Sequence, residues 1–196
     1  MKVIGLTGSF GTGKTFVASL FKSKGAKVLD ADAIAHECIT KGTPVFKKIV
    51  RAFGKRVLRP RGEIDRKKLA KIVFGNKKAL ARLNSLVHPE VIQKLRARIR
   101  RCGPEDIVVI DAPLLIEAGA KELVDKLIVV TCPKKRQIER CVKKFRIKRQ
   151  EVMKRIASQI PLKRKIKIAD FVIDNGKTKN ATKRQVEKLW KEIAWK

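Results

Sequence analysis

Residues 8–15 of this 196-residue chain, GSFGTGKT, decide its fold. They have the spacing G-x-x-x-x-G-K-T, which forms a phosphate-binding loop when a strand precedes it and a helix follows it. Both neighbours are expected here. Residues 2–7, KVIGLT, predict a short buried strand, and residues 14–24 place apolar side chains at helical spacing before Gly25, a residue that favours a helix end.

The loop predicts a site for a nucleoside triphosphate with Mg²⁺. Its glycines allow successive backbone N–H groups to converge on phosphate oxygens, and the helix that follows adds its positive end. Lys14 would reach the β and γ phosphates, and the hydroxyl of Thr15 would bind Mg²⁺. The residues expected to hold the nucleotide are Gly8, Gly11, Thr12, Gly13, Lys14, Thr15 and Phe16.

Strands and helices alternate along most of the chain. Continuous runs rich in Val and Ile predict strands that are covered on both faces at residues 106–111 and 125–131. Further strands are predicted at residues 26–32, which end in carboxylates, and at residues 170–174. An amphipathic pattern predicts a closing helix over residues 180–195. Since strands separated by helices form parallel sheets, the sequence predicts an α/β fold with a doubly wound five-stranded parallel sheet.

Residues 33–101 differ from the rest, because their apolar residues recur every three or four positions. This spacing predicts helices over residues 65–74, 76–88 and 89–101, with Asn76 as an N-cap. The segment therefore predicts a helical insertion between two strands of the sheet.

Aspartates lie beside the ends of the predicted strands. Asp30 and Asp32 lie at the end of the second predicted strand and Asp111 ends the third, in a chain with only 18 acidic residues. Ligands of parallel α/β sheets bind at the carboxyl ends of the strands. These carboxylates are therefore candidates for a site next to the loop, although each alone is equally typical of a helix cap or a loop residue.

The charge balance is strongly basic. The chain has 49 Lys and Arg residues, a net charge of +31 and a pI near 10.6, which favours attraction to polyanions. A nucleic-acid binder, an enzyme for highly phosphorylated small molecules and a merely solvated basic surface all fit this charge. Only 5% of the residues are aromatic and Tyr is absent, so no specific nucleic-acid partner is expected beyond weak, salt-sensitive binding.

Composition also bounds the compartment and the cysteine chemistry. No apolar run approaches the ~20 residues of a membrane span, and no secretory leader pattern occurs, so a cytoplasmic protein without a membrane partner is expected. The four cysteines are scattered and form no C-x-x-C pair. They are expected to be small buried or half-buried hydrophobic residues, and neither disulfides nor a zinc site is predicted.

The chain resembles the bacterial-type dephospho-coenzyme A kinase family over about residues 3–176. The resemblance rests on GLTGSFGTGKT, VLDADAIAHE, FGKRVL, GEIDRKKLAKIVF, LNSLVHPEV, DAPLLIEAG, QIER, RIASQ and ADFVIDN, in this order. DADAIAHE, LVHPEV and DAPLLIEAG are far more discriminating than the loop. The resemblance implies transfer of the γ-phosphoryl group of ATP to the ribose 3′-hydroxyl of dephospho-CoA, with Mg²⁺, as the last step of coenzyme A synthesis.

The resemblance also implies roles for the charged residues near the phosphates. Asp32 would orient the ribose hydroxyl and accept its proton, while Asp30 or Asp111 would hold Mg²⁺ through water. Arg140, with Lys14, would stabilise the migrating phosphoryl group, because a guanidinium can bind it in a bidentate manner. Arg155 is a second candidate from the same basic segment. A solvated basic helix is the alternative for both arginines, since residues 134–155 contain eleven basic side chains.

Further residues are assigned by the resemblance to the two substrates. The acceptor would contact His88, Pro113, Leu114, Leu115 and Glu117, and adenine would contact the backbone of Asn175 and Gly176. A structural role for His88 and plain core packing for residues 113–115 are the competing interpretations.

The resemblance implies a single P-loop kinase domain with three parts. The core would comprise residues 1–32, 104–133 and 160–196, the acceptor-binding insertion about residues 33–103, and a basic helical lid about residues 134–159. The chain departs from the family's usual pattern at Ser9-Phe10, at His36, which stands where Arg is frequent, and at Lys144, which replaces a frequent lid Arg.

Two alternative functions remain open from the residues. A related P-loop kinase for nucleosides or nucleotides would share the loop, the lid and the fold. A basic nucleic-acid-binding protein that keeps an ATPase loop would account for the charge.

Overall fold

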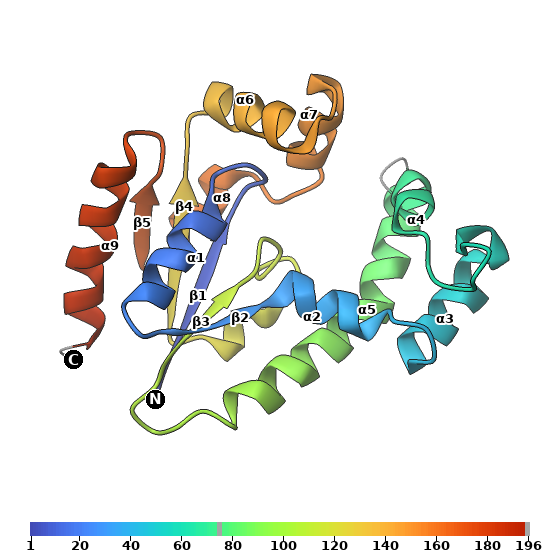
Figure 1. The fold of residues 1–196 in the computed structure, drawn as a ribbon, viewed down its shortest axis with the longest axis horizontal. Helices are drawn as coiled ribbons and strands as arrows, with labels where there is room; N and C mark the ends of the chain where they lie inside the picture. The colour runs from blue at the N-terminus through green and yellow to red at the C-terminus, as the bar shows by residue number, and fades with distance from the viewer. Residues whose placement is uncertain (74–75, 195–196) are drawn as a thin grey trace. The chain divides into compact units, whose positions relative to one another are not determined.

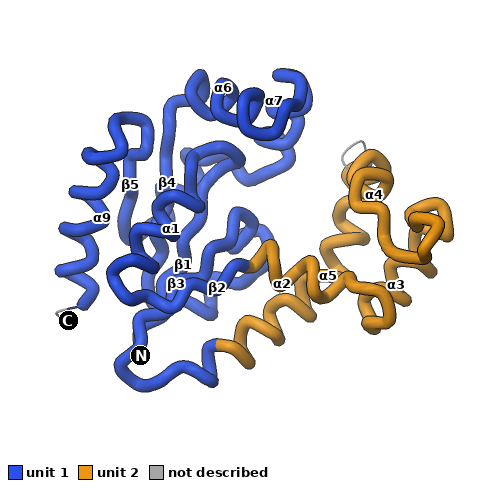
Figure 2. The backbone as a smooth tube through the Cα atoms, in the orientation of Figure 1, with its two compact units in different colours: residues 1–30, 99–196 blue, residues 31–98 orange. Residues whose placement is uncertain are grey.

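The computed structural model describes residues 1–73 and 76–194. Along the chain it divides into two compact units (Figure 2). Unit 1 comprises residues 1–30 and 99–196, and unit 2 comprises residues 31–98. Among the described residues, no helix has the length and apolar character that a membrane span requires.

Unit 1 is built on a five-stranded parallel sheet with the strand order β2-β3-β1-β4-β5 (Figure 1). The predicted α/β fold with five parallel strands is therefore confirmed. The strands are β1 (Lys2–Gly8), β2 (Lys27–Asp30), β3 (Ile107–Asp111), β4 (Lys126–Thr131) and β5 (Phe171–Asp174).

The central strands are apolar on both faces because helices cover both sides of the sheet. Val108, Val109 and Ile110 of β3 are all fully buried. On one face, α1 (Lys14–Ser23) and α9 (Lys179–Ala194) pack over the sheet, as Figure 1 shows. Gly25 follows α1 with φ +100°, and its N–H donates to Lys22 O, so this glycine ends the helix as expected.

Three further helices of unit 1 follow β4. They are α6 (Lys134–Phe145), α7 (Arg149–Ala157) and α8 (Leu162–Lys167), and a 3₁₀ turn, η2 (Ala120–Leu123), precedes β4. Ile138 and Cys141 of α6 pack with Val152 of α7 in a small separate core. This core holds α6 and α7 together as one helical pair.

Unit 2 is helical, as the periodicity of residues 33–101 predicts. It contains α2 (Ala31–Cys38), α3 (Pro44–Phe53), the 3₁₀ turn η1 (Lys55–Val57), α4 (Arg66–Val73) and most of α5 (Lys77–Ile99). Side chains cap three of these helices: Thr43 accepts from Phe46 N, Asp65 from Lys67 N and Lys68 N, and Asn76 from Ala79 N. The predicted N-cap at Asn76 is confirmed.

The two helices predicted over residues 76–88 and 89–101 are wrong, because α5 is one helix of 23 residues with Pro89 inside it. Proline removes one helical hydrogen bond and usually bends or breaks a helix. Here Leu95 and Ile99 are buried on the far side of Pro89, and this packing extends the helix past the proline. Two residues of the predicted helices, Phe74 and Trp195, lie outside the described residues.

Candidate active site

The glycine loop lies between β1 and α1, at the carboxyl edge of the sheet. Gly11 and Gly13 both have φ +85°, a backbone conformation that L side chains rarely adopt. A side chain on Gly13 would collide with the amide of Asn175, and one on Gly11 would collide with the thiol of Cys141. The loop is therefore a closely surrounded backbone turn at the N-terminus of a ten-residue helix, which is the arrangement that binds phosphate.

Lys14 forms an ion pair with Asp111, the last residue of β3. Both side chains are largely buried, with 12% and 8% of their surfaces exposed. Asp111 is the register partner of Leu6 on β1 and of Asp30 on β2, so two carboxylates meet at the ends of adjacent strands. The ammonium group that sequence analysis assigns to the phosphates is thus held at the edge of the sheet where ligands of this fold bind.

The oxygen donors near the loop suit Mg²⁺. Thr15 is exposed at the second position of α1, and Asp30 and Asp111 end neighbouring strands. Within residues 1–73 and 76–194, no three His, Cys, Asp or Glu side chains form a metal cluster. Magnesium usually binds one or two protein oxygens and completes its shell with water and substrate phosphates, and this donor set fits that pattern.

Asn175 follows β5, and its side chain forms a hydrogen bond to the glycine loop. Its Nδ2 donates to Thr12 O at 2.7 Å, and its Oδ1 accepts from Thr182 Oγ1 at 3.0 Å. Asn175 is only 5% exposed, so both groups of its amide find partners inside the protein. This side-chain role of Asn175 was not predicted from the sequence.

The backbone of Asn175 and Gly176, which is predicted to contact adenine, forms hydrogen bonds within the protein. Asn175 N donates to Thr131 O at 2.9 Å, and Gly176 N donates to Asp174 Oδ1 at 2.7 Å. Contact between these two residues and adenine stays a prediction, and what the structure establishes is that residues 174–176 form a tightly bonded turn.

Two arginines on one face of α6 bind this turn. Arg140 donates to Asn175 O at 3.0 Å and, at 3.5 Å, to Cys132 Sγ. Arg136, four residues earlier, donates to Gly176 O. Arg140 also lies beside the loop, since its Nη1 is 3.4 Å from the point where a side chain on Gly13 would begin. Arg136 was not predicted, although its i, i+4 spacing from Arg140 is the signal that places both on one helix face.

Phe10 explains the departure at Ser9-Phe10. Its ring stacks on Phe145 at the end of α6, with ring centroids 5.3 Å apart and an interplanar angle of 22°. The guanidinium of Arg155 lies 5.4 Å from the centroid of the Phe10 ring, a cation–π geometry. Arg155 also pairs with Glu151 one turn earlier on α7, at 2.6 Å. The loop therefore packs directly against the predicted lid.

Two residues of the predicted acceptor wall have partners within the protein. Leu115 is 1% exposed and packs in the core, which agrees with plain core packing, and its contact with the acceptor stays a prediction. The carboxylate of Glu117 forms an ion pair at 2.8 Å with Lys165, whose side chain is fully buried. It also accepts a hydrogen bond from Ile160 N at 3.0 Å. Pro113 and Leu114 remain half-buried. The motif DAPLLIEAG does not show which of its side chains are buried.

The predicted residues of unit 2 lie on two helices. Asp32 is exposed in the first turn of α2, two residues along the chain from the end of β2, and His36 is exposed one turn later. His88 is half-buried on α5, directly before Pro89.

The four cysteines are buried or half-buried, as expected. Cys38, Cys132 and Cys141 are buried free thiols, and burial raises the pKa of each. For Cys132 this burial outweighs the opposing effect of Arg140, so the thiol stays protonated at neutral pH.

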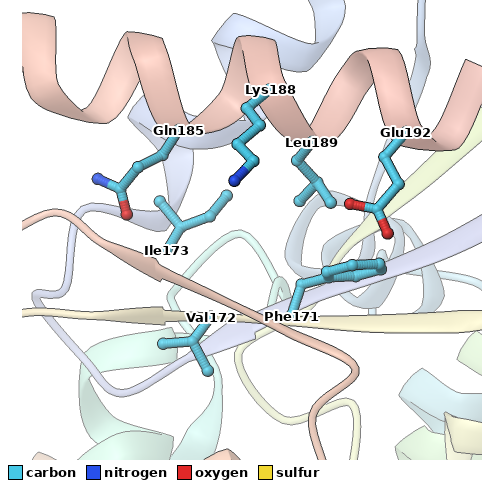
Figure 3. Close-up of a pocket in the computed structure, with 7 residues that line it drawn as sticks. All are labelled: Phe171, Val172, Ile173, Gln185, Lys188, Leu189 and Glu192. Carbon is cyan, nitrogen blue, oxygen red and sulfur yellow. The ribbon is translucent and has the colours of Figure 1, made fainter.

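A hollow between β5 and α9 is a less suitable site (Figure 3). Leu189 of α9 faces Ile173 and Phe171 of β5, while Val172 points to the other side of the strand. The carboxamide of Gln185 binds the backbone N–H and C=O of Asp174, so it caps the strand. None of the residues that line this hollow belongs to the predicted site.

Comparisons with known proteins agree with these observations. A family model described as dephospho-CoA kinase matches residues 2–180. A dephospho-CoA kinase of Carboxydothermus hydrogenoformans is 40% identical over 198 aligned residues, covering 100% of this chain and 96% of the relative. One of Bacillus licheniformis is 44% identical, covering 97% of this chain and 98% of the relative.

Solved structures are also similar to this chain over nearly its whole length. A protein of Thermus thermophilus superimposes with a TM-score of 0.83 at 30% identity, covering 98% of this chain and 97% of the other. A dephospho-CoA kinase of Campylobacter jejuni gives a TM-score of 0.72 at 31% identity, covering 99% and 98%. A shikimate kinase of Aquifex aeolicus, at 17% identity and a TM-score of 0.54, shares the fold alone.

Proposed function

The chain belongs to the dephospho-CoA kinase family, and we propose that its exposed Asp32 prepares the acceptor while residues 8–16 hold the donor. The protein transfers the γ-phosphoryl group of ATP to dephospho-CoA and forms CoA and ADP, the final step of coenzyme A biosynthesis. ATP with Mg²⁺ is the donor. The curated relatives share this name, so neither a nucleotide kinase nor a nucleic-acid-binding protein is favoured.

The observation that carries the donor part of the proposal is the ion pair between Lys14 and Asp111 beside the glycine loop. Phosphoryl transfer passes through a loose, in-line transition state, so catalysis is mostly positioning and charge stabilisation. Lys14 supplies a positive charge near the transferred group, and Asp111 fixes where that charge lies. Mg²⁺, held by Thr15 with Asp111 or Asp30, would neutralise charge on the phosphates when bound.

On the acceptor side, Asp32 orients the ribose 3′-hydroxyl of dephospho-CoA and accepts its proton as the new bond to phosphorus forms. Its exposure at the start of α2 supports this role, because an acceptor can reach the carboxylate. His88, Pro113 and Leu114 are the other candidates for contact with the acceptor, since each keeps a partly exposed surface.

We assign α6 and α7, within residues 134–159, to a lid, and residues 33–103 to acceptor binding. Arg140 stabilises the phosphoryl group from the lid, which its proximity to Gly13 supports. Arg155 assists it from α7. A cytoplasmic location suits the enzyme, because its four free cysteines fit a reducing compartment.

The direct test is a turnover assay. Purified protein is incubated with ATP, Mg²⁺ and either dephospho-CoA or a nucleoside monophosphate, and CoA is identified by mass spectrometry and by its 3′-phosphate. We expect rapid conversion of dephospho-CoA alone. Faster phosphorylation of the monophosphates would overturn the assignment of the acceptor.

A further inference from the structure

Gln159 lies in the segment between α7 and α8 and binds the glycine loop. Its Oε1 accepts from Phe10 N at 2.8 Å and from Ser9 Oγ at 3.2 Å. Gln159 is the last residue of the RIASQ motif, and the resemblance gives it no role.

The peptide group between Ser9 and Phe10 is therefore hydrogen-bonded through both its N–H and its C=O. Its N–H donates to Gln159, and its carbonyl oxygen, Ser9 O, accepts from Thr12 N at 3.2 Å and from Thr12 Oγ1 at 3.0 Å. Thr12 O in turn accepts from Asn175. Rotation of this peptide would break the bond from Phe10 N to Gln159 and both bonds from Thr12 to Ser9 O, so Gln159 helps to fix the direction of the first half of the loop.

The position of Gln159 is itself fixed by its neighbour. Ile160 N donates to Glu117 Oε1 at 3.0 Å, and Glu117 pairs with the fully buried Lys165. Lys165 also donates to Pro113 O at 2.8 Å. Because a buried ammonium group is stable only with such partners, this arrangement is a rigid support for residues 159 and 160.

We propose that Gln159 is a positioning residue that sets the glycine loop in its ATP-binding conformation from the end of the lid. A neutral carboxamide oxygen suits this place, since it accepts two hydrogen bonds without bringing negative charge near phosphate. The proposal rests on the proposed function only in taking ATP as the ligand of the loop. It predicts an effect on ATP and none on the acceptor.

The test compares Gln159→Ala with Gln150→Ala, a control that removes an exposed glutamine of α7 in the same lid. ATP affinity is measured by calorimetry with ATP and Mg²⁺ alone, and KM is then measured for each substrate. We expect Gln159→Ala to weaken ATP binding about 10-fold, the effect of losing one or two hydrogen bonds, with KM for dephospho-CoA unchanged. The control should match the wild type.

Wild-type ATP affinity in Gln159→Ala, or an equal rise in both KM values, would overturn the proposal. If Gln159→Ala fails to fold, Gln159→Asn takes its place, because it keeps the carboxamide but makes the side chain one methylene shorter. The same results for ATP affinity and for the two KM values would then support or overturn the proposal. Failure of the proposed function appears differently, as a wild-type enzyme that binds ATP but does not phosphorylate dephospho-CoA.

Discussion

Asn175 donates a hydrogen bond across 163 residues of sequence to the carbonyl oxygen of Thr12, at 2.7 Å. This bond brings the turn after β5 against the glycine loop at Gly13. The loop is therefore held from the side by Asn175 and at its first half by Gln159.

Gly13→Ala should disrupt this contact. The new methyl group would meet the amide of Asn175 at a backbone conformation with φ +85°, so ATP affinity should fall by about 10-fold or more as the Asn175–Thr12 bond is displaced. Gly25→Ala is the matched control, because Gly25 also has positive φ but nothing lies within 4 Å of its added methyl. The control should lose about 1–2 kcal/mol of stability and keep its ATP affinity. Calorimetric titration and thermal unfolding separate the two outcomes.

Lys14→Ala should abolish most of the activity. The transferred group loses its nearest cation, and removal of one such charge typically lowers kcat about 100-fold or more. Lys22→Ala, an exposed lysine in the last turn of the same helix, is the control and should keep its rate. The measurement is ADP release at saturating substrates, with circular dichroism to verify folding. Near-normal turnover in Lys14→Ala would contradict the assignment.

Asp32→Asn should lower kcat severely and leave ATP affinity unchanged, since this carboxylate acts on the acceptor. A loss of at least about 100-fold is expected from removal of a general base. Glu37→Gln, an exposed change on the same helix, should have little effect, because its ion pair with Arg98 is at the surface. If Asp32→Asn instead weakened ATP binding at a normal rate, Asp32 would belong to the donor side.

Stability should depend on acid pH through Asp170. The hydrogen bond from Leu127 N, assisted by Lys126, holds the pKa of this carboxyl below its usual value of about 3.9. A lowered pKa stabilises the fold at pH values above the ordinary, unfolded-state pKa. This stabilisation disappears as pH falls through the folded-state pKa. Asp170→Asn should therefore unfold at lower urea than the wild type at pH 7, and the gap should narrow near pH 3.

Glu105→Gln, a change at an exposed position, is the control for this measurement. If the difference in urea unfolding between Asp170→Asn and the wild type stays constant with pH, the charge of Asp170 is not the cause of the lost stability.

Much of the fold was predictable because local patterns determine it. The apolar runs of the sheet and the spacing of residues 8–15 are legible over a few residues, and the strands and the loop lie where they were expected. Helix α5 was not predictable, since Pro89 is a strong local signal for a helix end and only tertiary packing of Leu95 and Ile99 overrides it.

Residues that support the site were harder to predict. Lys165 is one of 49 basic residues and lies in LKRKIK, a segment that would be expected to be solvated. Its burial depends on Glu117 and Pro113, which are about fifty residues away in the chain. Gln159 and Asn175 likewise act through long-range bonds to backbone atoms, for which no local pattern exists.

The burial of three thiols makes the fourth chemically distinct. Cys38, Cys132 and Cys141 are at most 6% exposed, whereas Cys102 is partly accessible between α5 and β3. A maleimide fluorophore would therefore label the folded wild-type enzyme at Cys102 first. Cys102 is four positions beyond Arg98, where unit 2 ends, so a dye attached there would report on the surroundings of that junction without any engineered cysteine.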